Sequence, residues 1–449
     1  MLLIKIITAL LSGALMLGTW FTFATVDARL TNDQRELMEQ AQIYIDNGIY
    51  HRAIATLNSA MIFGHENNST IQYAIAELQL QSGNIREYRN LMHTIVNSAN
   101  LPEGVSLAQL YHELYDFYTR HERLDDTIAL LATAASRTGD QDLFRLYQSY
   151  RYLFRERRGV YQHVDMTHQA VARFKQGDLY GFITGAGTVI RPPVYELATN
   201  MFNNQAVVYR DGVLEIINRG GQRQALAGFD TNGLTNIKRF TGDSFAINFG
   251  DGYRFATWTA PDVNFHLFEI EPFEYVGLTT EGVRALKRGG LWSLDGVNFV
   301  YPSVAMDQRG RVAVNGRVFV REANAYYMRN LEGDRLAGPF QDARPFFETG
   351  GLAAVKQQGY WGLIDNQGNV IVDFGFDDAQ SSSMGLAAVA FGGQWGYLSV
   401  ADYPEEFRHE FFARLVIEPQ FFEARPFVNG VAPIRTESGW AYISLIAFE

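Results

Sequence analysis

The 449-residue sequence has no cysteine, only 12 prolines and no excess of positive charge. Without cysteine the chain can form no disulfide bond, and thiol catalysis and thiolate zinc sites are excluded. The 38 lysines and arginines are outnumbered by 49 aspartates and glutamates, which gives a formal net charge of −11. Such a charge argues against a nucleic-acid partner, because phosphate binding needs a basic surface. The apolar share of 47% is that of a globular protein with buried cores.

The sequence also lacks the common motifs of catalytic and metal sites. It contains no Gly-x-Ser-x-Gly elbow, no Gly-Lys-Ser/Thr phosphate loop and no calcium loop of the Asp-x-Asp-x-Asp-Gly type. No two of its nine histidines have the His-x-x-x-His spacing that places two imidazoles on one helix face, and His163 and His168 are five residues apart. We therefore predict no catalytic residue, no metal ligand and no cofactor, and a protein that is not an enzyme.

Residues 1–28 differ from the rest of the chain. Lys5 precedes an apolar run from Ile6 to about Ala24, and small residues suited to signal-peptide cleavage follow at Val26-Asp27-Ala28. The run is close to the ~20 apolar residues that cross a bilayer. A cleaved signal peptide and an N-terminal membrane anchor are therefore both open. Either one places residues 30–449 outside the cytoplasm, secreted, periplasmic or tethered, with membrane contact only through this segment.

Residues 29–158 are predicted to form an α-helical repeat domain. Only one proline, Pro102, interrupts the helical pattern. Gly48 and Gly83 are 35 residues apart, and each is placed to end the first helix of an antiparallel pair. The pattern resembles tetratricopeptide repeats, and an ordinary helical bundle is the alternative. A basic cluster is expected at the solvated end of the last helix, where cations suit the dipole: Arg151, Arg155, Arg157 and Arg158.

Residues 159–449 are predicted to form an all-β domain, because short apolar runs alternate with glycines and one phrase recurs. Its clearest copy begins with Trp361-Gly362 and continues into Asp365-x-x-Gly368. The head of the phrase returns as Trp395-Gly396 and as Trp440-Ala441, and degraded heads are Tyr180-Gly181 and Tyr326. A second phrase, Gly-Leu-Ala-Ala-Val, stands between the heads at 351–355 and 385–389.

Each part of the phrase has a structural interpretation. The tryptophan faces one side of a strand and is interpreted as a core residue, and the glycine beside it leaves room for a neighbouring backbone or ring. Asp365-x-x-Gly368 is a hairpin turn, with a capping side chain first and a glycine free to take positive φ last. The same turn is expected at Thr184–Gly187, Asn218–Gly221, Asp307–Gly310 and Asn330–Gly333.

These residues resemble the WG-repeat family, bacterial arrays with an aromatic-Gly head, an Asp/Asn-x-x-Gly turn and a Gly-Leu-Ala-x-Val strand. The resemblance is specific over 325–449 and weaker over 165–325, where Trp258 and Trp292 stand in poorly matching frames. Copies of 34–45 residues allow seven or eight units after Val171. Since short strands cannot bury a face alone, the copies must stack, which favours a ring-closed β-propeller, with an open β-solenoid as the alternative.

The chain is thus predicted to be multidomain, with residues 1–28 as signal or anchor, 29–158 helical and 159–449 β. We expect a non-catalytic scaffold of the bacterial cell envelope that binds protein partners through its helical and β-repeat surfaces. The alternative is a carbohydrate-binding or carbohydrate-active propeller with an envelope glycan as partner, since exposed aromatic rings can stack on sugars. The residues singled out are structural repeat positions: Tyr180, Gly181, Tyr326, Trp361, Gly362, Asp365, Gly368, Trp395, Gly396 and Trp440.

The apolar run after Lys5 generates a prediction about location. The full-length chain should fractionate with membranes or be exported, whereas a chain that starts at Arg29 should be soluble and folded, because it lacks the apolar segment. Cell fractionation followed by N-terminal sequencing measures both properties. Full-length, uncleaved protein free in the cytosol would contradict the prediction.

Overall fold

The computed structural model describes residues 30–62, 68–167, 170–226, 230–239, 244–259, 264–268, 271–400 and 414–448. The chain divides into two compact units, Met1–Arg151 and Tyr152–Glu449. The predicted signal or anchor at residues 1–28 lies outside the described residues. Within the described ranges, no helix is long and apolar enough to cross a membrane.

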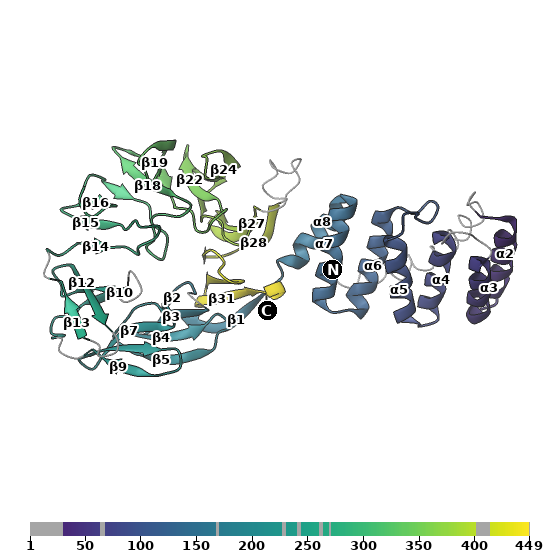
Figure 1. Ribbon diagram of the computed structural model, residues 1–449, viewed down its shortest axis with the longest axis horizontal. Coiled ribbons are helices and arrows are strands. Elements are labelled where there is room, and N and C mark those ends of the chain that lie inside the picture. Colours follow the sequence, from purple (N-terminus) through teal and green to yellow (C-terminus); the bar gives the residue numbers. More distant parts are fainter. Residues whose placement is uncertain are drawn as a thin grey trace. The chain divides into compact units, whose positions relative to one another are not determined.

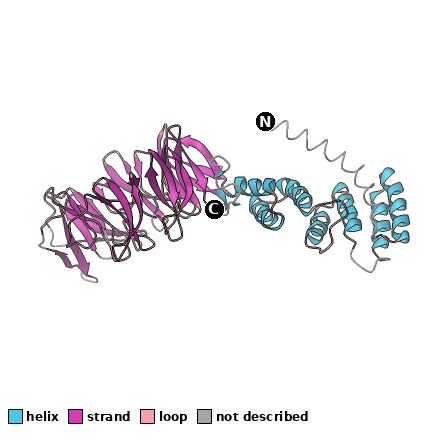
Figure 2. Ribbon diagram, turned by 90° about the horizontal axis from the view of Figure 1, so that it is seen from above, coloured by secondary structure: helices cyan, strands magenta, loops and turns pink. Residues whose placement is uncertain are grey.

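The first unit is a succession of α-helices (Figure 2). The described helices are α2 (Asn32–Asp46), α3 (Tyr50–Ile62), α4 (Ser69–Gln81), α5 (Ile85–Val96), α6 (Leu107–His121), α7 (Leu124–Thr138) and α8 (Gln141–Arg151). As predicted, Gly48 and Gly83 follow the ends of α2 and α4 with positive φ, at 70° and 79°. The fully buried Ala53 of α3 lies in one apolar cluster with residues of α2 and α4. Assignment of these helices to the tetratricopeptide class stays a prediction.

The second unit contains eight small antiparallel sheets in its described residues, which we number as blades 1 to 8 in chain order (Figure 1). Blade 1 contains β2 (His163–Val164), β3 (Val171–Gln176), β4 (Leu179–Thr184) and β5 (Val189–Tyr195). Blade 2 contains β6 (Leu197–Ala198), β7 (Gln205–Arg210), β8 (Val213–Asn218) and β9 (Arg223–Ala225). Blade 3 contains β10 (Asn236–Arg239), β11 (Ser244–Asn248), β12 (Tyr253–Thr259) and β13 (Asn264–Leu267). Blade 4 has three strands, β14 (Tyr275–Val276), β15 (Leu286–Arg288) and β16 (Leu291–Ser293).

The remaining blades follow the same order. Blade 5 contains β17 (Ser303–Val304), β18 (Arg317–Glu322), β19 (Ala325–Asn330) and β20 (Arg335–Phe340). Blade 6 contains β21 (Asp342–Ala343), β22 (Ala353–Gln357), β23 (Tyr360–Ile364) and β24 (Val370–Phe376). Blade 7 contains β25 (Asp378–Ala379), β26 (Leu386–Phe391), β27 (Gln394–Ser399) and β28 (Leu415–Phe421). Blade 8 contains β29 (Glu423–Ala424), β30 (Val431–Thr436) and β31 (Gly439–Leu445), and a 3₁₀ turn at Ile446–Phe448 follows.

The fourth strand of blade 8 comes from the start of the unit. β1 (Phe154–Tyr161) pairs antiparallel with β31, from Phe154 opposite Leu445 to Tyr161 opposite Trp440. An apolar cluster also joins blade 8 to blade 1, where Trp440 and Tyr442 pack with Phe174. The sheets therefore close into a ring, and β1 covers the edge that β31 would otherwise leave open. The expectation of a β-propeller is confirmed, with eight blades, and the open solenoid is excluded.

The predicted boundary at residues 158 and 159 is wrong. The last described helix ends at Arg151, and the sheet starts at Phe154. Arg155 and Arg157, expected at a helix end, lie instead on β1. The reason is that β1 is stabilised by hydrogen bonds to a strand at the opposite end of the unit. A local helical or alternating pattern cannot register such a partner.

One row of residues crosses each blade at the same level. In blade 6 it joins Asp342, Lys356, Trp361 and Phe376 across the four strands. The third-strand residues of this row are Tyr180, Leu214, Tyr253, Trp292, Tyr326, Trp361, Trp395 and Trp440. Trp292 therefore does occupy the head position, contrary to expectation. Residues 214, 253 and 292 are 39 residues apart instead of 34. The longer loops in these blades break the 34-residue spacing by which the heads were recognised in the sequence.

Ring closure by β1 generates the second prediction. A chain that starts at Tyr152 should fold as a closed ring, whereas one that starts at Gln162 lacks β1 and leaves β31 as an open edge. We expect the shorter chain to melt about 10 °C or more lower, or to aggregate, because it loses a full strand of ladder bonds. Circular dichroism during heating measures this, and equal midpoints for the two chains would refute the closure role of β1.

Candidate functional site

The repeat tryptophans are buried and do not form an exposed binding surface. Trp361, Trp395 and Trp440 are only 4%, 8% and 7% exposed. Trp361 packs with apolar side chains of blade 6 and of blade 7, including Leu398. In these positions the rings fill the space between adjacent sheets, and their faces are not available for stacking on a sugar ring.

The glycine after the aromatic residue is required by a close approach of the fourth strand. A Cβ atom on Gly362 would lie 2.8 Å from the carbonyl oxygen of Val372, and one on Gly181 would lie 2.7 Å from that of Arg191. Gly396 is crowded in the same way by the backbone of β28. The prediction that this glycine leaves room for a neighbouring backbone is confirmed.

Blade 5 meets the same constraint with a glycine on the other strand. Its head, Tyr326, is followed by Tyr327, which carries a large side chain. Here the glycine is Gly338 of β20, with φ of 117°, where a Cβ atom would lie 2.8 Å from the carbonyl oxygen of Tyr326. Close contact between the third and fourth strands is therefore kept although the Trp-Gly pair is lost.

The predicted turn at Asp365–Gly368 forms as expected. The Asp365 carboxylate accepts hydrogen bonds from the amides of Gln367 and Asn369, and Gly368 has φ of 93°. The four other predicted turns also close with an N–H to C=O bond from the glycine. One of them, Asp307–Gly310, does not join the outer strands but follows the first strand of blade 5, so it lies near the ring centre.

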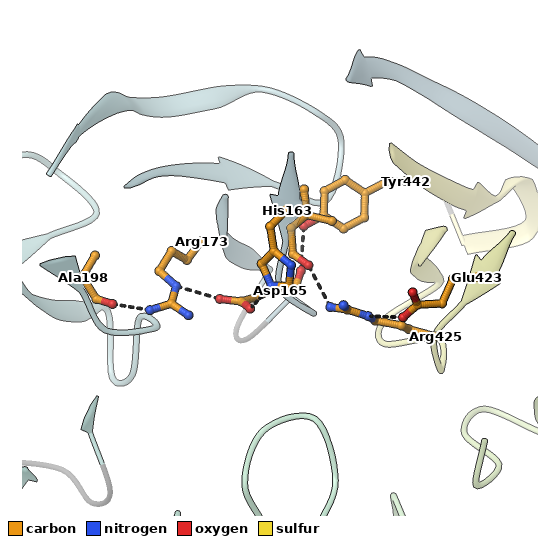
Figure 3. Close-up of polar contacts among 8 residues, drawn as sticks. His163, Asp165, Arg173, Ala198, Glu423, Arg425 and Tyr442 are labelled. Atoms are coloured by element: carbon orange, nitrogen blue, oxygen red, sulfur yellow. Dashed lines mark hydrogen bonds and ion pairs between the residues drawn. The ribbon is translucent and has the colours of Figure 1, made fainter. Parts of the chain in front are cut away.

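Charged side chains lie near the centre of the ring, just after the first strand of blades 1, 5, 6 and 8. Figure 3 shows the contacts where blade 8 meets blade 1. Asp165 accepts a hydrogen bond from Nε of Arg173 at 2.7 Å and contacts Nε2 of His163 at 3.1 Å. Arg173 also donates to the carbonyl of Ala198 in blade 2. A chain of polar contacts thus connects neighbouring first strands.

We call the contacts around Asp165, where blade 8 meets blade 1, the seam. Blade 8 contributes two further hydrogen bonds to it. Arg425 donates from Nη1 to the carbonyl oxygen of Val164 at 2.8 Å, and the Tyr442 hydroxyl donates to the carbonyl oxygen of Asp165 at 2.8 Å. Glu423 lies 3.7 Å from Nε of Arg425. The first and last blades are therefore joined by hydrogen bonds at the centre as well as by β1 at the rim.

Burial and charge act in opposite directions on Asp165. Burial alone would raise the pKa of its carboxyl group, but Arg173 and His163 together hold the pKa well below its usual value. Burial lowers the pKa of Arg425 and raises that of Tyr442. Asp165 is therefore ionised at neutral pH and is not a proton donor.

An arginine stacked on the head aromatic recurs in three blades. Arg344 lies 4.5 Å from the ring centre of Trp361, Arg425 lies 4.0 Å from that of Trp440, and Arg173 lies 4.7 Å from that of Tyr180. Each arginine also donates to a carbonyl group in the first strand of the next blade. The stacking fixes the guanidinium group while its N–H groups bind the neighbouring blade.

A cavity of about 270 Å³ occupies part of the ring centre. It is lined by the first strands and following loops of blades 1 to 4, by Arg425 and by the Asp307–Gly310 turn. Within that turn, Arg309 reaches across to blade 1 and donates to the carbonyl oxygen of Thr167 at 2.8 Å. The charged residues that line the cavity are Asp165, Arg173, Lys238, Arg239, Asp307, Arg309 and Arg425.

These groups suit binding better than acid–base chemistry. The second carboxylate of the cavity, Asp307, is held by Arg311 at 2.6 Å and by two backbone amides. Among the described residues, no group of three or more histidines and carboxylates is placed to hold a metal ion. Most of the charged side chains that line the cavity are cationic hydrogen-bond donors.

Sequence reasoning did not identify these central residues. Arg344 and Arg425 belong to the repeated phrase Ala-Arg-Pro-Phe, so their recurrence was a signal that could have marked them. Lys238 and Arg309 lie outside the recognised phrases, and only the closed ring brings them to one cavity.

The seam generates a prediction for Asp165. Asp165→Asn should lower the free energy of unfolding at pH 7 by about 3 kcal/mol, because it breaks a buried ion pair and leaves Arg173 unbalanced. Since the folded-state pKa is depressed, this stabilisation is present above about pH 4 and is lost as the pH falls below it. The difference between the two proteins should thus be smaller at pH 3.

Urea titrations at both pH values measure this effect. Asp178→Asn is the matched control, because Asp178 forms an exposed ion pair with Lys175 at 3.6 Å and should leave the midpoint unchanged. If Asp165→Asn behaved like the control, the seam would not contribute to stability.

Comparisons with known proteins agree with the repeat assignment. The family model for the WG containing repeat matches residues 361–395 and 413–440. No curated protein sequence matches the chain. In blades 6 and 7 the Trp-Gly pair and the second-strand phrase occupy equivalent positions in the strand pairing, with Gly362 opposite Val355 and Gly396 opposite Val389.

Solved propeller structures are similar only at low scores. PorZ, a surface component of the type-IX secretion system of Porphyromonas gingivalis, is 11% identical, with 63% of this chain and 42% of that chain covered and a TM-score of 0.31. A streptogramin B lyase is 9% identical, with 65% and 97% covered and a TM-score of 0.32. The WD40 repeats of RRP9 are 11% identical, with 65% and 97% covered and a TM-score of 0.34.

This chain thus spans less than half of the length of PorZ. The number of blades and their closure come from the strand pairing described above. Together with the family match at residues 361–395 and 413–440, the buried tryptophan heads lead to one conclusion: the C-terminal blades of this protein contain WG repeats.

Proposed function

We propose that this protein is a non-catalytic scaffold of the bacterial cell envelope that binds protein partners on the surface of its propeller and of its helical unit. The observation that carries this proposal is a set of exposed apolar side chains at equivalent positions of the ring. The first residue of the third strand is apolar and 36% to 51% exposed in four blades: Leu179, Val213, Leu291 and Tyr360. Exposed apolar residues that recur on one face are typical of protein interaction sites.

These four residues follow the turn between the second and third strands. Because each blade is antiparallel, all such turns lie on one face of the ring, and the links from a fourth strand to the next first strand lie on the same face. Phe391 and Phe422 add two exposed aromatic side chains there, each 48% exposed. We call these six residues the hairpin face.

The carboxylates of the central cavity support a binding role over a hydrolytic one. A glycosidase needs a carboxylic acid with a raised pKa opposite a second carboxylate. Asp165 has a lowered pKa and an arginine partner, and Asp307 is bound by Arg311. The envelope location is proposed from the apolar run between Ile6 and Ala24.

A second candidate is binding of an envelope glycan. It is favoured by the exposed rings of Tyr360, Phe391 and Phe422, which could stack on sugars. The buried Trp361, Trp395 and Trp440 do not contribute to it. The two candidates therefore use overlapping surfaces but different partners.

A quadruple variant of the hairpin face tests the proposal. Leu179→Ser, Val213→Ser, Leu291→Ser and Tyr360→Ser together should abolish cross-linking of the protein to specific envelope proteins, with a melting midpoint close to that of the wild type. The control is Val189→Ser with Val370→Ser, since these exposed residues begin fourth strands and lie toward the opposite face.

The readout is cross-linking and mass spectrometry on envelope fractions, beside binding to purified envelope glycan. Retained protein cross-links in the quadruple variant would refute the hairpin face as the docking surface. Loss of glycan binding, with no protein cross-link in the wild type, would favour the second candidate.

A further inference from the structure

The central cavity has a charge opposite to that of the whole protein. The chain carries a formal net charge of −11, yet five cationic side chains and two carboxylates line the cavity. Cations gathered in a partly enclosed space raise the local concentration of anions, because low-dielectric walls focus the field. The cavity is therefore an electropositive site in an acidic protein.

Several of these charges are already compensated by neighbours. Arg173 is paired with Asp165 at 2.7 Å, and Arg425 lies 3.7 Å from Glu423. Asp307 is paired with Arg311, which does not line the cavity. The carboxylates at the site therefore do not balance the remaining cations.

Lys238 is the least compensated of them. Among the described residues its ammonium group has no hydrogen bond and no ion pair, and it lies 3.6 Å from the ring centre of Tyr275 and 5.0 Å from that of Tyr253. Burial, with a smaller effect of Arg173, lowers the pKa of Lys238 to about 8. The two aromatic rings position the ammonium group but leave its three N–H donors without oxygen acceptors.

Arg309 presents the second uncompensated charge. It donates one N–H to the carbonyl oxygen of Thr167, while its Nε is buried without a hydrogen-bond partner. The Asp307–Gly310 turn is held in place, because the Leu278 amide donates to the carbonyl oxygen of Gly310 at 2.9 Å. The side-chain oxygen of Asn200, also on the cavity wall, is buried without a partner. Buried polar groups without partners are costly, and a ligand removes that cost if its oxygen atoms accept from Arg309 and a hydroxyl group donates to Asn200.

We propose that the cavity between blades 1 to 5 binds a small organic anion, with Lys238 and Arg309 as its charged contacts and Asn200 as a neutral one. A volume of about 270 Å³ lies just below the ~300–1,000 Å³ range of ligand pockets. It suits a short carboxylate, a sugar acid or a phosphate, and is too small for a polymer chain. This site is separate from the hairpin face, so either proposal can fail without the other.

Isothermal titration of the purified full-length protein in detergent, with succinate, glucuronate and inorganic phosphate as probes, tests the site. At least one probe should bind the wild type at low salt, and Lys238→Gln should weaken that binding about tenfold. Lys287→Gln is the matched control, because Lys287 also lies over an aromatic ring, that of Trp292, but is paired with Glu274 outside the cavity. The control should change binding less than twofold.

The pH dependence gives a second readout. Lys238 loses its charge as the pH rises through about 8, so affinity for the carboxylate probes should be full well below that pH and should fall above it toward the roughly tenfold weaker binding of Lys238→Gln. The other groups facing Lys238 are Tyr253 on β12, Tyr275 on β14 and Arg173 on β3, and burial raises both tyrosine pKa values. Between pH 6 and 9, Lys238 is thus the facing group that changes charge.

Lys238→Arg separates a charge effect from a folding effect. It keeps the positive charge at all these pH values, so it should bind the probe and lose the decline above pH 8. The relative affinities of the wild type for the two carboxylates and for phosphate show which class of anion the cavity prefers. No binding of any probe by the wild type at millimolar concentration, or equal binding by Lys238→Gln, would overturn the proposal.

Discussion

The structure depends on the pairing of β1 with β31. An array of small sheets buries its apolar faces only between neighbours, so an open array leaves one face and one edge exposed at each end. Here the first strand of the unit completes the last blade, with Tyr161 opposite Trp440. Apolar clusters then lie between all successive blades in the described residues, including blade 8 and blade 1. Closure turns repeats that are individually unstable into a single cooperative body.

A closed ring imposes a second constraint, because neighbouring sheets must approach closely over their whole width. Head aromatics fill the gap in every blade except blade 2, which has Leu214. In blades 1, 5, 6 and 7 a glycine lets the third and fourth strands come together beside the aromatic ring. In blade 6 that glycine is Gly362 on the third strand, and in blade 5 it is Gly338 on the fourth. The requirement is therefore for one small residue at the contact, and the Trp-Gly pair is one way of meeting it.

The centre of the ring contains two kinds of charge. The guanidinium groups of Arg173, Arg344 and Arg425 stack on aromatic rings and donate hydrogen bonds to carbonyl groups of the next blade. Lys238 and Arg309 line the cavity, and each has N–H groups that make no hydrogen bond within the described residues. The same part of the fold thus combines bonds that hold blades together with positive charge that lines a cavity, and we propose separate partners for this cavity and for the hairpin face.

The helical and β composition, the repeat phrase and the turns could all be predicted from the sequence, because each depends on residues close along the chain. Gly48, Gly368 and the Trp361-Gly362 pair are of this kind. Three other features depend on tertiary contacts. Residues 154–161 pair with β31, a strand at the other end of the unit. Trp292 occupies the head position although longer loops break the 34-residue spacing. Lys238 and Arg309 line one cavity only because the ring closes. These features depend on contacts between residues far apart in sequence, which no local spacing records.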